Sequence, residues 1–589
     1  MRQAWGRLFS RNPQTGLKRI SAEVFTAELP IRQPLVALQQ AFPEAVAQLQ
    51  LLAAEAERQL RDAVVLEFEV DSGELRCQNA LPLERTAQAA CKIAVALVQE
   101  ELLSREEAIF RVDPHDLRAL LVASLEDSPE ASLYRGQSRV PGVASGRIVL
   151  SAAAAVRAKE PVILLCERLT YVERDALHRL DGLIIRAGSS LAAGHYECPC
   201  VLIPDCNLNE GQWVTMDATT GQVYDGDVPM VTGSLSADAE ILLEWTDAFR
   251  RVEVRANVAN LEEARLAPFW GAQGVGLFRI ESLFLVPHRL PLFQTVLRQI
   301  CCQELSASPA YDQIVSEVSE DVAALLEAAP GPFNVRLLDA PLSQMLGYWR
   351  DSGELPEDYF SGTLGVWIQE LNPMQGLRCG RLSLLYPRLM EIQLRAVLRA
   401  WGGRRGRLQV MMPGVCDAHE LRLFRRCLAQ VAEQEGAPLP EIGSMLEIPR
   451  ACLLAEELAE EVDFLAFGTG DLTESTCGMS RYDSPLSFLP AYLEQSVFER
   501  DPFESLDQGG VGALMRWACR RVQSKCPSVE MGTVGAQAVD PKSLDFCVGL
   551  GLKYVSVPVR HLPVARLAAA QASLRPGSPR QQVARLHRS

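Results

Sequence analysis

Eight short apolar runs, each bounded by segments with helical spacing, occupy the stretch from about residue 234 to residue 571. The runs are Val252–Ala256, Gly274–Phe278, Asn334–Leu338, Leu408–Met412, Gly443–Glu447, Phe464–Phe467, Val529–Gly532 and Tyr554–Val557. Runs of this length are typical of buried strands, and their alternation with helices favours a parallel sheet. Eight such units in succession predict a (β/α)8 barrel, the TIM barrel.

Two carboxylates follow consecutive strands of this predicted barrel. Glu447 lies in the segment MLEIPR that ends the fifth run, and Asp471 lies in FGTGDLT, which follows the sixth. Functional groups of such barrels lie where strands pass into loops, so the two side chains can meet over one divalent cation. Mg²⁺ is often held by one or two carboxylates together with oxygens of the substrate. The pair therefore predicts a metal-bound oxyacid.

Four arginines occupy comparable positions. Arg279 and Arg336 lie at the second and third runs, Arg378 follows Asn372-Pro373, and Arg481 comes ten residues after Asp471. The fixed donor fork of arginine can hold carboxylate and phosphate oxygens in pairs. A single arginine at a strand end usually forms a surface ion pair, and a single acid often caps a helix. The combination favours an oxyacid site.

Several segments resemble the phosphoenolpyruvate-utilising enzymes, which include pyruvate phosphate dikinase, phosphoenolpyruvate synthase and Enzyme I of the sugar phosphotransferase system. The resemblance is strongest to the C-terminal two-thirds of the dikinase and runs from about Leu35 to Gln571. Besides MLEIPR and FGTGDLT, it is carried in dikinase order by SREEAIFRVDP at 104–114, PGVASG at 141–146, NPMQGLR at 372–378 and PVARLAAAQ at 563–571.

The resemblance implies specific roles. Arg279, Arg336 and Arg481 match phosphoenolpyruvate-binding arginines, and Arg378 matches the arginine of an NPxxGxR motif. The magnesium ligands of the family match Glu447 and Asp471. The implied ligand is phosphoenolpyruvate or pyruvate, the implied cofactor is Mg²⁺, and the implied enzyme class is phosphotransferase. The implied assembly is a homodimer through the barrel or an association with a full-length relative.

The resemblance also predicts the domain boundaries. Residues 35–130 resemble the end of the dikinase nucleotide-binding region as a helical remnant with one hairpin, 137–232 a swivelling phosphohistidine α/β domain, and 234–575 the phosphoenolpyruvate/pyruvate-binding barrel. Basic tails are predicted at 1–34 and 576–589; an organellar presequence is the alternative for the first. Most of the nucleotide-binding domain has no counterpart and no glycine-rich phosphate loop occurs, so no ATP site is expected.

The carrier histidine of the family is replaced. Its loop reads GGxTSHAAxxAR, whereas residues 187–199 here read AGSSLAAGHYECP, which places Gly188 at the histidine position. His195 lies seven residues further and is the alternative carrier. A carrier histidine transfers phosphate as a covalent intermediate, so its replacement predicts that this transfer is interrupted.

The acid of the family is replaced as well. Its cysteine lies in a GxCGE segment before the final strand, and counting back from Asp540-Pro541 puts Val534 at this position. A valine side chain cannot donate a proton to an enolate. Gly470 replaces the asparagine of FGTND, while Ile280 and Ser282 replace threonine and histidine of an RTEH pattern.

Together these departures predict a degenerate family member that retains Mg²⁺-dependent binding of phosphoenolpyruvate or pyruvate and acts as a regulator. One alternative is a metal-dependent enzyme acting on a pyruvate enolate. Another is a partial phosphotransferase that interconverts pyruvate and phosphoenolpyruvate with a separate subunit, and a scaffold without ligand is the last. Catalysis is thus left open by the sequence, with a pseudoenzyme favoured.

Composition also bears on the partners and the cellular setting of the chain. The net charge of −16 and the lack of a recognition motif argue against nucleic acid. The 16 cysteines lack the paired spacing of metal ligands, and no secretory signal is found. A reducing, cytoplasmic setting is therefore expected. No apolar run reaches the roughly 18 residues of a membrane span.

Overall fold

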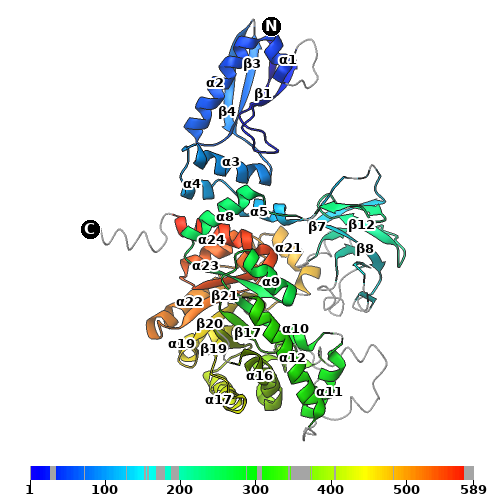
Figure 1. Cartoon of the computed structure of the whole chain (residues 1–589), viewed down its shortest axis with the longest axis vertical. Helices are drawn as coiled ribbons and strands as arrows, with labels where there is room; N and C mark the ends of the chain where they lie inside the picture. Colours follow the sequence, from blue (N-terminus) through cyan, green and yellow to red (C-terminus); the bar gives the residue numbers. More distant parts are fainter. Residues whose placement is uncertain are drawn as a thin grey trace, which may run out of the picture. The chain divides into compact units, whose positions relative to one another are not determined.

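The computed structural model describes residues 2–575 except 27–34, 72, 128, 130, 152–153, 156–157, 159, 168–179, 187–197, 232, 287, 302–307, 330, 343–344, 346–371, 373–374, 403–405 and 482. The chain forms two compact units (Figure 1). The first contains residues 1–124, 231–250 and 566–589, and the second contains residues 125–230 and 251–565. No helix in the described part of the chain has the length and apolar character needed to cross a bilayer.

The first unit begins with an antiparallel four-stranded sheet in the order β2-β1-β3-β4. Alternate residues of the central strand β3 are buried, which is the pattern of a sheet with one covered face. Helices α1 and α2 pack on this sheet. The elements are β1 (Arg2–Phe9), β2 (Ser21–Thr26), α1 (Leu35–Ala41), α2 (Pro43–Leu60), β3 (Val64–Asp71) and β4 (Glu74–Pro82). The hairpin expected within residues 64–77 is therefore present as β3 and β4.

Strands β1 and β2 contradict the basic tail predicted for residues 1–34. β1 pairs with both β2 and β3, and Ala4 and Leu8 are fully buried. Arg11 is also fully buried, with its Nε 2.9 Å from Oε1 of Glu57 and its Nη2 2.9 Å from Oε2 of Glu100. The acids that compensate Arg11 are distant in sequence, so a local charge count mistakes this segment for a tail.

Helices make up the rest of the first unit. Ser104 begins one of them with a reciprocal capping box to Glu107. Nε2 of Gln571 donates to the carbonyls of Ile109 (2.8 Å) and Val112 (2.9 Å), which joins the helix that contains Gln571 to this part of the unit. The helices are α3 (Ala87–Gln99), α4 (Arg105–Ile109), α5 (Pro114–Leu121), α8 (Ala237–Phe249) and the C-terminal part of α24 (Leu562–Leu574).

The second unit contains a mixed sheet in the order β6-β13-β12-β8-β9-β10-β11-β7. Its central strands β8, β9, β10 and β11 are parallel, and β9 and β10 are buried along their length, as expected for strands covered on both faces. The strands of this region are β5 (Ser124–Leu125), β6 (Tyr134–Arg135), β7 (Gln137–Val140), β8 (Val143–Val149), β9 (Val162–Cys166), β10 (Gly182–Ile185), β11 (Cys200–Leu202), β12 (Trp213–Asp217), β13 (Gln222–Asp225) and β14 (Met230–Val231).

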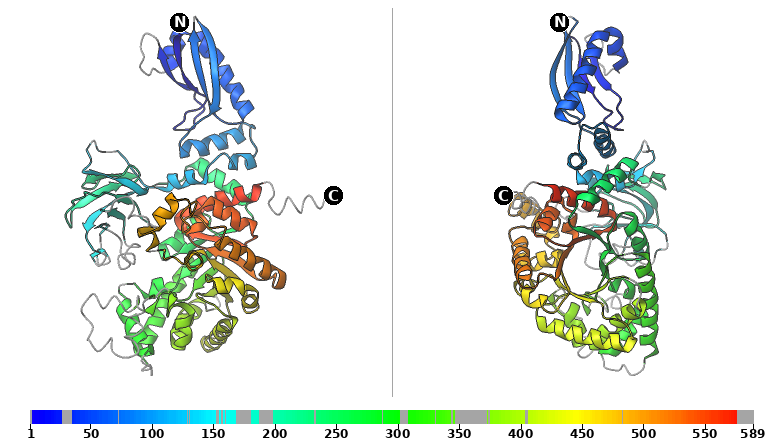
Figure 2. Two further views of the ribbon diagram at one scale, coloured as in Figure 1. Left: turned by 180° about the vertical axis from the view of Figure 1, so that it is seen from behind. Right: turned by 60° about the vertical axis from the view of Figure 1, so that its left-hand side comes forward.

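The predicted (β/α)8 barrel is confirmed. Strands β15 to β22 pair in parallel and close into a barrel, and the right-hand view of Figure 2 shows the ring with its helices outside. The strands are β15 (Glu253–Val258), β16 (Val275–Arg279), β17 (Phe333–Arg336), β18 (Leu408–Met412), β19 (Glu441–Leu446), β20 (Phe464–Gly468), β21 (Glu530–Val534) and β22 (Tyr554–Pro558).

Helices of unequal length connect the barrel strands. The larger ones bury one apolar face, as in α16, which ends at Gly402 in the left-handed conformation that glycine favours. The helices are α9 (Leu261–Phe269), α10 (Glu281–Phe284), α11 (Leu290–Cys301), α12 (Pro309–Ala328), α15 (Cys379–Leu385), α16 (Pro387–Trp401), α17 (Ala418–Glu435), α18 (Pro449–Leu453), α19 (Ala455–Ala459), α20 (Thr469–Cys477), η4 (Ser484–Leu486), α21 (Leu489–Glu494), α22 (Val511–Lys525), η5 (Ala536–Val539), α23 (Pro541–Gly549), η6 (Val559–His561) and the start of α24.

A polar network fixes the N-terminal ends of the barrel strands. Buried Arg255 lies 4.0 Å above the ring of Tyr554 and bonds to Gln409, whose Nε2 donates to Glu441 (2.8 Å). Arg407 holds the Glu441 carboxylate with two bonds of 2.7 Å. We call these five residues the basal network. In such barrels this end contributes stability, whereas ligands bind at the opposite end.

Candidate functional site

The predicted site residues lie at the C-terminal ends of the barrel strands. Arg279 and Arg336 are the last residues of β16 and β17 and stand opposite each other in the register of this pair. Glu447 directly follows β19, and Asp471 lies in the first turn of α20, after β20. Parallel strands place these positions at one end of the barrel, which explains why residues far apart in sequence form one cluster.

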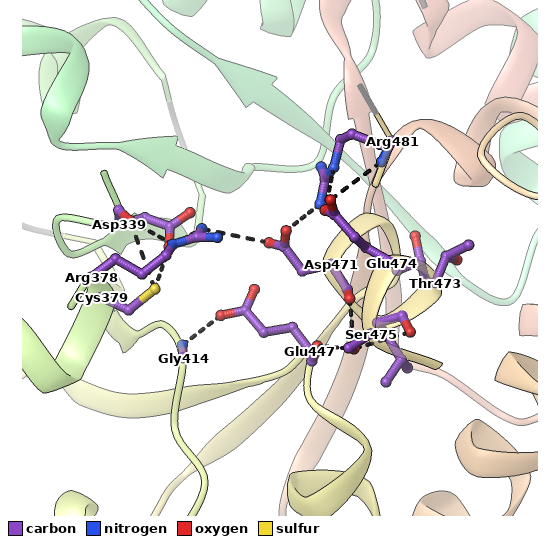
Figure 3. A network of polar contacts seen from close by, with 12 residues as sticks. Asp339, Arg378, Cys379, Gly414, Glu447, Asp471, Thr473, Glu474, Ser475 and Arg481 are labelled. Atoms are coloured by element: carbon purple, nitrogen blue, oxygen red, sulfur yellow. Dashed lines mark hydrogen bonds and ion pairs between the residues drawn. The ribbon is translucent and has the colours of Figure 1, made fainter. Parts of the chain in front are cut away.

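Ion pairs join most of these residues into an alternating chain, here called the mouth network. Arg336 pairs with Glu281 and, at 2.8 Å, with Asp339. Arg378 lies 2.6 Å from Asp339 and 3.9 Å from Asp471. Both contacts are drawn as dashed lines in Figure 3. Arg481 pairs with Asp471 and, at 2.9 Å, with Glu474. In order, the members are Glu281, Arg336, Asp339, Arg378, Asp471, Arg481 and Glu474.

Asp339 is the centre of this network. Its side chain is 9% exposed, and its two oxygens contact the guanidinium groups of Arg336 and Arg378. Burial opposes ionisation of Asp339, but the two arginines outweigh it and hold the pKa of Asp339 below its usual value. The carboxylate is therefore ionised, and it orients both arginines at the barrel mouth.

Glu447 lies beside the network but is not neutralised by it. One carboxylate oxygen accepts a hydrogen bond from the backbone N–H of Gly414, and the other is buried without a hydrogen-bonding partner. Burial, followed by the charges of Asp471 and Asp339, raises the pKa of Glu447 to about 8, although Arg336 and Arg378 oppose this rise. The carboxyl group is thus buried without an ion-pair partner among the described residues. This is the situation expected of a metal ligand before the metal binds.

Cys379 borders the same space. Its thiol donates to Oδ1 of Asp339 at 2.6 Å, and burial, followed by the charge of Asp339, raises the pKa of the thiol well above its usual value. The ligand atoms of Asp339, Cys379 and Glu447 lie within 4.8 Å of one another. A Cβ atom at Gly414 would lie 2.4 Å from Cβ of Cys379, so only glycine permits this close approach.

Asp471 and Glu447 lie on the same side of the barrel mouth. Figure 3 shows both carboxylates directed toward the side on which Asp339, Arg378 and Cys379 lie. Ser475 donates to the carbonyl of Asp471 at 2.7 Å, which anchors the start of α20. The structure therefore brings together Arg336, Arg378, Arg481, Glu447 and Asp471 from distant parts of the chain.

The remaining predicted positions differ from this cluster. The side chain of Arg279 is exposed, whereas Arg336 beside it is 6% exposed. Val534, the position of the family acid, is buried among apolar side chains of the barrel interior. Gly188 and His195 lie outside the described residues, so the carrier position stays a prediction.

Four residues of the mouth were missed by sequence reasoning: Glu281, Asp339, Cys379 and Glu474. Asp339 follows Arg336 by three residues, and Cys379 directly follows Arg378. An acid or thiol so close in sequence to a predicted binding arginine at a strand end could have been predicted to lie at the same site. The pairing of Arg481 with Glu474 carries no such signal, because it depends on how the loop after α20 folds back.

Comparisons with known proteins agree with this fold. The family described as PEP-utilising enzyme, PEP-binding domain matches residues 234–574. The chain is 32% identical to "Pyruvate, phosphate dikinase 1, chloroplastic" of Arabidopsis thaliana, over 96% of this chain and 64% of that protein. It is 32% identical to "Pyruvate, phosphate dikinase" of Clostridium symbiosum, over 97% of this chain and 71% of that protein.

The chain thus spans about two-thirds of the length of these relatives. The same identity is found with "Pyruvate, phosphate dikinase" of Rhizobium meliloti, over 97% of this chain and 70% of the relative. The profile covers the barrel, and the relatives match along nearly the whole chain. This protein therefore belongs to the phosphoenolpyruvate-utilising enzyme family and is similar to pyruvate phosphate dikinase.

Proposed function

We propose that the barrel binds phosphoenolpyruvate or pyruvate with Mg²⁺ and that the chain has lost phosphoryl transfer. The observation that carries this proposal is the convergence of three buried or half-buried arginines and two carboxylates at the barrel mouth. Guanidinium groups suit the carboxylate and phosphate oxygens of such a ligand. In (β/α)8 barrels, ligands bind at this end of the strands.

Mg²⁺ fits the donor set of Glu447 and Asp471. Both offer carboxylate oxygens, which hard cations prefer, and one buried oxygen of Glu447 has no partner. A bound cation would compensate these acids and polarise an oxygen of the ligand. The side chains of Arg336 and Arg378 would face the same ligand, with Asp339 fixing their orientation.

The arginines of the mouth network are already paired with acids. An incoming oxyacid therefore has to replace some of these contacts. The exchange is favourable only if the cation takes over Asp471 while the ligand takes over Arg481 and Arg378. This coupling makes binding of metal and oxyacid interdependent, which is the basis of the proposed Mg²⁺ requirement.

Loss of phosphoryl transfer follows from the substituted positions. Val534 offers no proton, and its side chain packs in the apolar interior of the barrel. The replacement of the carrier histidine by Gly188 also supports the loss of phosphoryl transfer. A binder without turnover is suited to regulation, and we extend the proposal to a homodimer through the barrel or to association with a full-length relative.

Calorimetric titration tests the proposal. Phosphoenolpyruvate and pyruvate are each titrated with and without Mg²⁺ into wild type, Asp471→Asn and Arg481→Ala. We expect Mg²⁺-dependent heat in wild type and its loss in both variants. Arg422→Ala is the matched control. Arg422 belongs to α17, and its exposed side chain pairs with Glu461 outside the mouth network. No heat with either ligand in the presence of Mg²⁺ would overturn the proposal.

Two further readouts address the alternative functions. Exchange of pyruvate methyl protons with deuterated solvent, followed by NMR, would show enolate chemistry in place of simple binding. Transfer of phosphate from labelled phosphoenolpyruvate to the chain or to a partner would show a partial phosphotransferase. We expect neither signal.

A further inference from the structure

The mouth network has more negative than positive groups. It contains four carboxylates and three guanidinium groups, and Glu447 adds a fifth carboxylate. With Glu447 ionised, the formal charge of the cluster is therefore −2. Such an excess of buried negative charge is costly unless a cation or a proton compensates it. One divalent cation would offset this charge. When the Cys379 thiol also binds the cation, its proton passes to solvent and the formal charge of the loaded cluster is −1.

The ligand set decides which cation fits. Asp339, Cys379 and Glu447 offer one sulfur and two carboxylates within 4.8 Å of one another, and all three residues are buried. Mg²⁺ prefers oxygen ligands, whereas a thiolate favours Zn²⁺ and ions of similar softness. Three protein ligands with a fourth position left for water or substrate are typical of catalytic zinc sites.

Two further observations point to a ligand at this place. Glu447 is 3% exposed, and one of its carboxylate oxygens has no hydrogen-bonding partner. Arg336 and Arg378 hold the Asp339 carboxylate in a fixed orientation, as groups behind a metal ligand commonly do. Oδ2 of Asp339 keeps a second lone pair for a cation, and Oδ1 regains one when the Cys379 thiol that donates to it loses its proton.

We propose that Asp339, Cys379 and Glu447 form a site for a borderline divalent cation such as Zn²⁺ or Co²⁺. The site shares Glu447 with the Mg²⁺ position of the proposed function, so the softer cation competes with Mg²⁺. It does not require Asp471 or an oxyacid. A metal held here would present its open position to the same ligand that the arginines bind.

Co²⁺ is the probe for this site, because a thiolate bound to Co²⁺ gives a charge-transfer band in the near ultraviolet. Metal-free full-length protein is titrated with Co²⁺ alone. We expect the band to saturate at one equivalent, to disappear on addition of Zn²⁺, and to persist in excess Mg²⁺. Absence of a saturable thiolate band would overturn the proposal.

Variants assign the band to these residues. Cys379→Ser and Glu447→Gln should each weaken Co²⁺ binding by roughly tenfold or more, and only Cys379→Ser should also abolish the band at saturating Co²⁺. Cys198→Ser is the matched control, because Cys198 lies with Cys166 and Cys200 in an apolar cluster elsewhere and should leave the band unchanged. Thermal unfolding of each metal-free variant checks that it folds. A band that survives in Cys379→Ser, or that is lost in Cys198→Ser, would overturn the assignment.

The outcome separates this inference from the proposed function. Asp471→Asn should remove Mg²⁺-dependent oxyacid binding while leaving the Co²⁺ band intact. Oxyacid binding without a thiolate band contradicts only the inference made here. A thiolate band without oxyacid binding contradicts only the proposed function.

Discussion

Arg481 occupies space that Gly470 leaves open: a Cβ atom at Gly470 would lie 2.9 Å from Nη1 of Arg481. This approach is too close, so any larger residue at position 470 has to displace the arginine. The position allows Arg481 to pair with Asp471. The replacement of the family asparagine by Gly470 therefore affects the charge balance at the mouth as well as removing an amide.

Gly470→Ala should tighten Mg²⁺ binding. The added methyl group displaces Arg481, so Asp471 loses a competing cation. We expect affinity to rise by roughly threefold to tenfold, the equivalent of about 1 kcal/mol. Calorimetric titration with Mg²⁺ measures this change. Gly549→Ala is the control, because a Cβ there meets no atom within 4 Å. Unchanged or weaker Mg²⁺ binding would contradict the prediction.

Arg336→Met should destabilise the protein strongly. It leaves Asp339 and Glu281 with less compensation in a buried place, which typically costs about 3–5 kcal/mol. Urea unfolding at neutral pH measures the change. For comparison, Arg399→Met removes a pair with Glu435 whose arginine side chain is 45% exposed and should cost less than about 1 kcal/mol. Equal losses in the two variants would contradict the central role of Asp339.

Glu441→Gln should reveal a pH-dependent contribution of the basal network. Burial opposes ionisation of Glu441, but bonds from Arg407 and Gln409 outweigh it and lower the pKa of Glu441 in the folded protein. The stabilisation is fully present above the pKa of the unfolded chain and is lost as pH falls through the lower folded value. We expect Glu441→Gln to cost about 1 kcal/mol at pH 7, and we expect this cost to diminish as pH falls below about 4.3, the usual pKa of a glutamate, and through the lower folded value.

Urea unfolding as a function of pH measures this difference. Glu433→Gln, on the exposed side of α17, serves as the control and should change the free energy of unfolding by less than about 0.5 kcal/mol. A loss in Glu441→Gln that stays constant across the acidic range would show that the charge of Glu441 is irrelevant.

At position 379, substitution by glycine should give a more stable protein than substitution by alanine. The φ of 57° at Cys379 lies in the left-handed region, where a side chain costs about 1–2 kcal/mol. In metal-free protein, Cys379→Gly should therefore be more stable than Cys379→Ala by about 1 kcal/mol. At Cys452, inside α18, the order should reverse because alanine is the better helix former. The same order at both positions would contradict the strain at Cys379.

The barrel could be predicted because its signal is local. Each strand is a short apolar run, and all eight predicted runs overlap the observed strands β15 to β22. The positions of Glu447 and Asp471 follow from the same pattern, since Glu447 directly follows β19 and Asp471 lies three residues after the end of β20. Arg336 and Arg378 could likewise be assigned to the mouth from their places relative to strands and motifs.

The contacts of the mouth could not be predicted because they join residues from different loops. Asp339 meets Arg378 across 39 positions of the chain, and Glu447 meets Gly414 across 33. The first strands were missed for the same reason: β1 pairs with β3, and Arg11 is neutralised by Glu57, which lies 46 positions away. The residues adjacent in sequence do not reveal partners that lie so far away along the chain.

The basal network lies at the opposite ends of the strands from the mouth network, and the two share no residue. Substitutions at the mouth therefore leave the anchoring of the strands intact. A lineage with this architecture can exchange the less buried ligand groups of the mouth while the strands stay anchored, whereas Arg336 has to be kept because it compensates buried acids. Such a barrel is a suitable host for laboratory redesign of ligand preference, in which libraries at the more exposed mouth positions are screened with Arg336 and the basal network held constant.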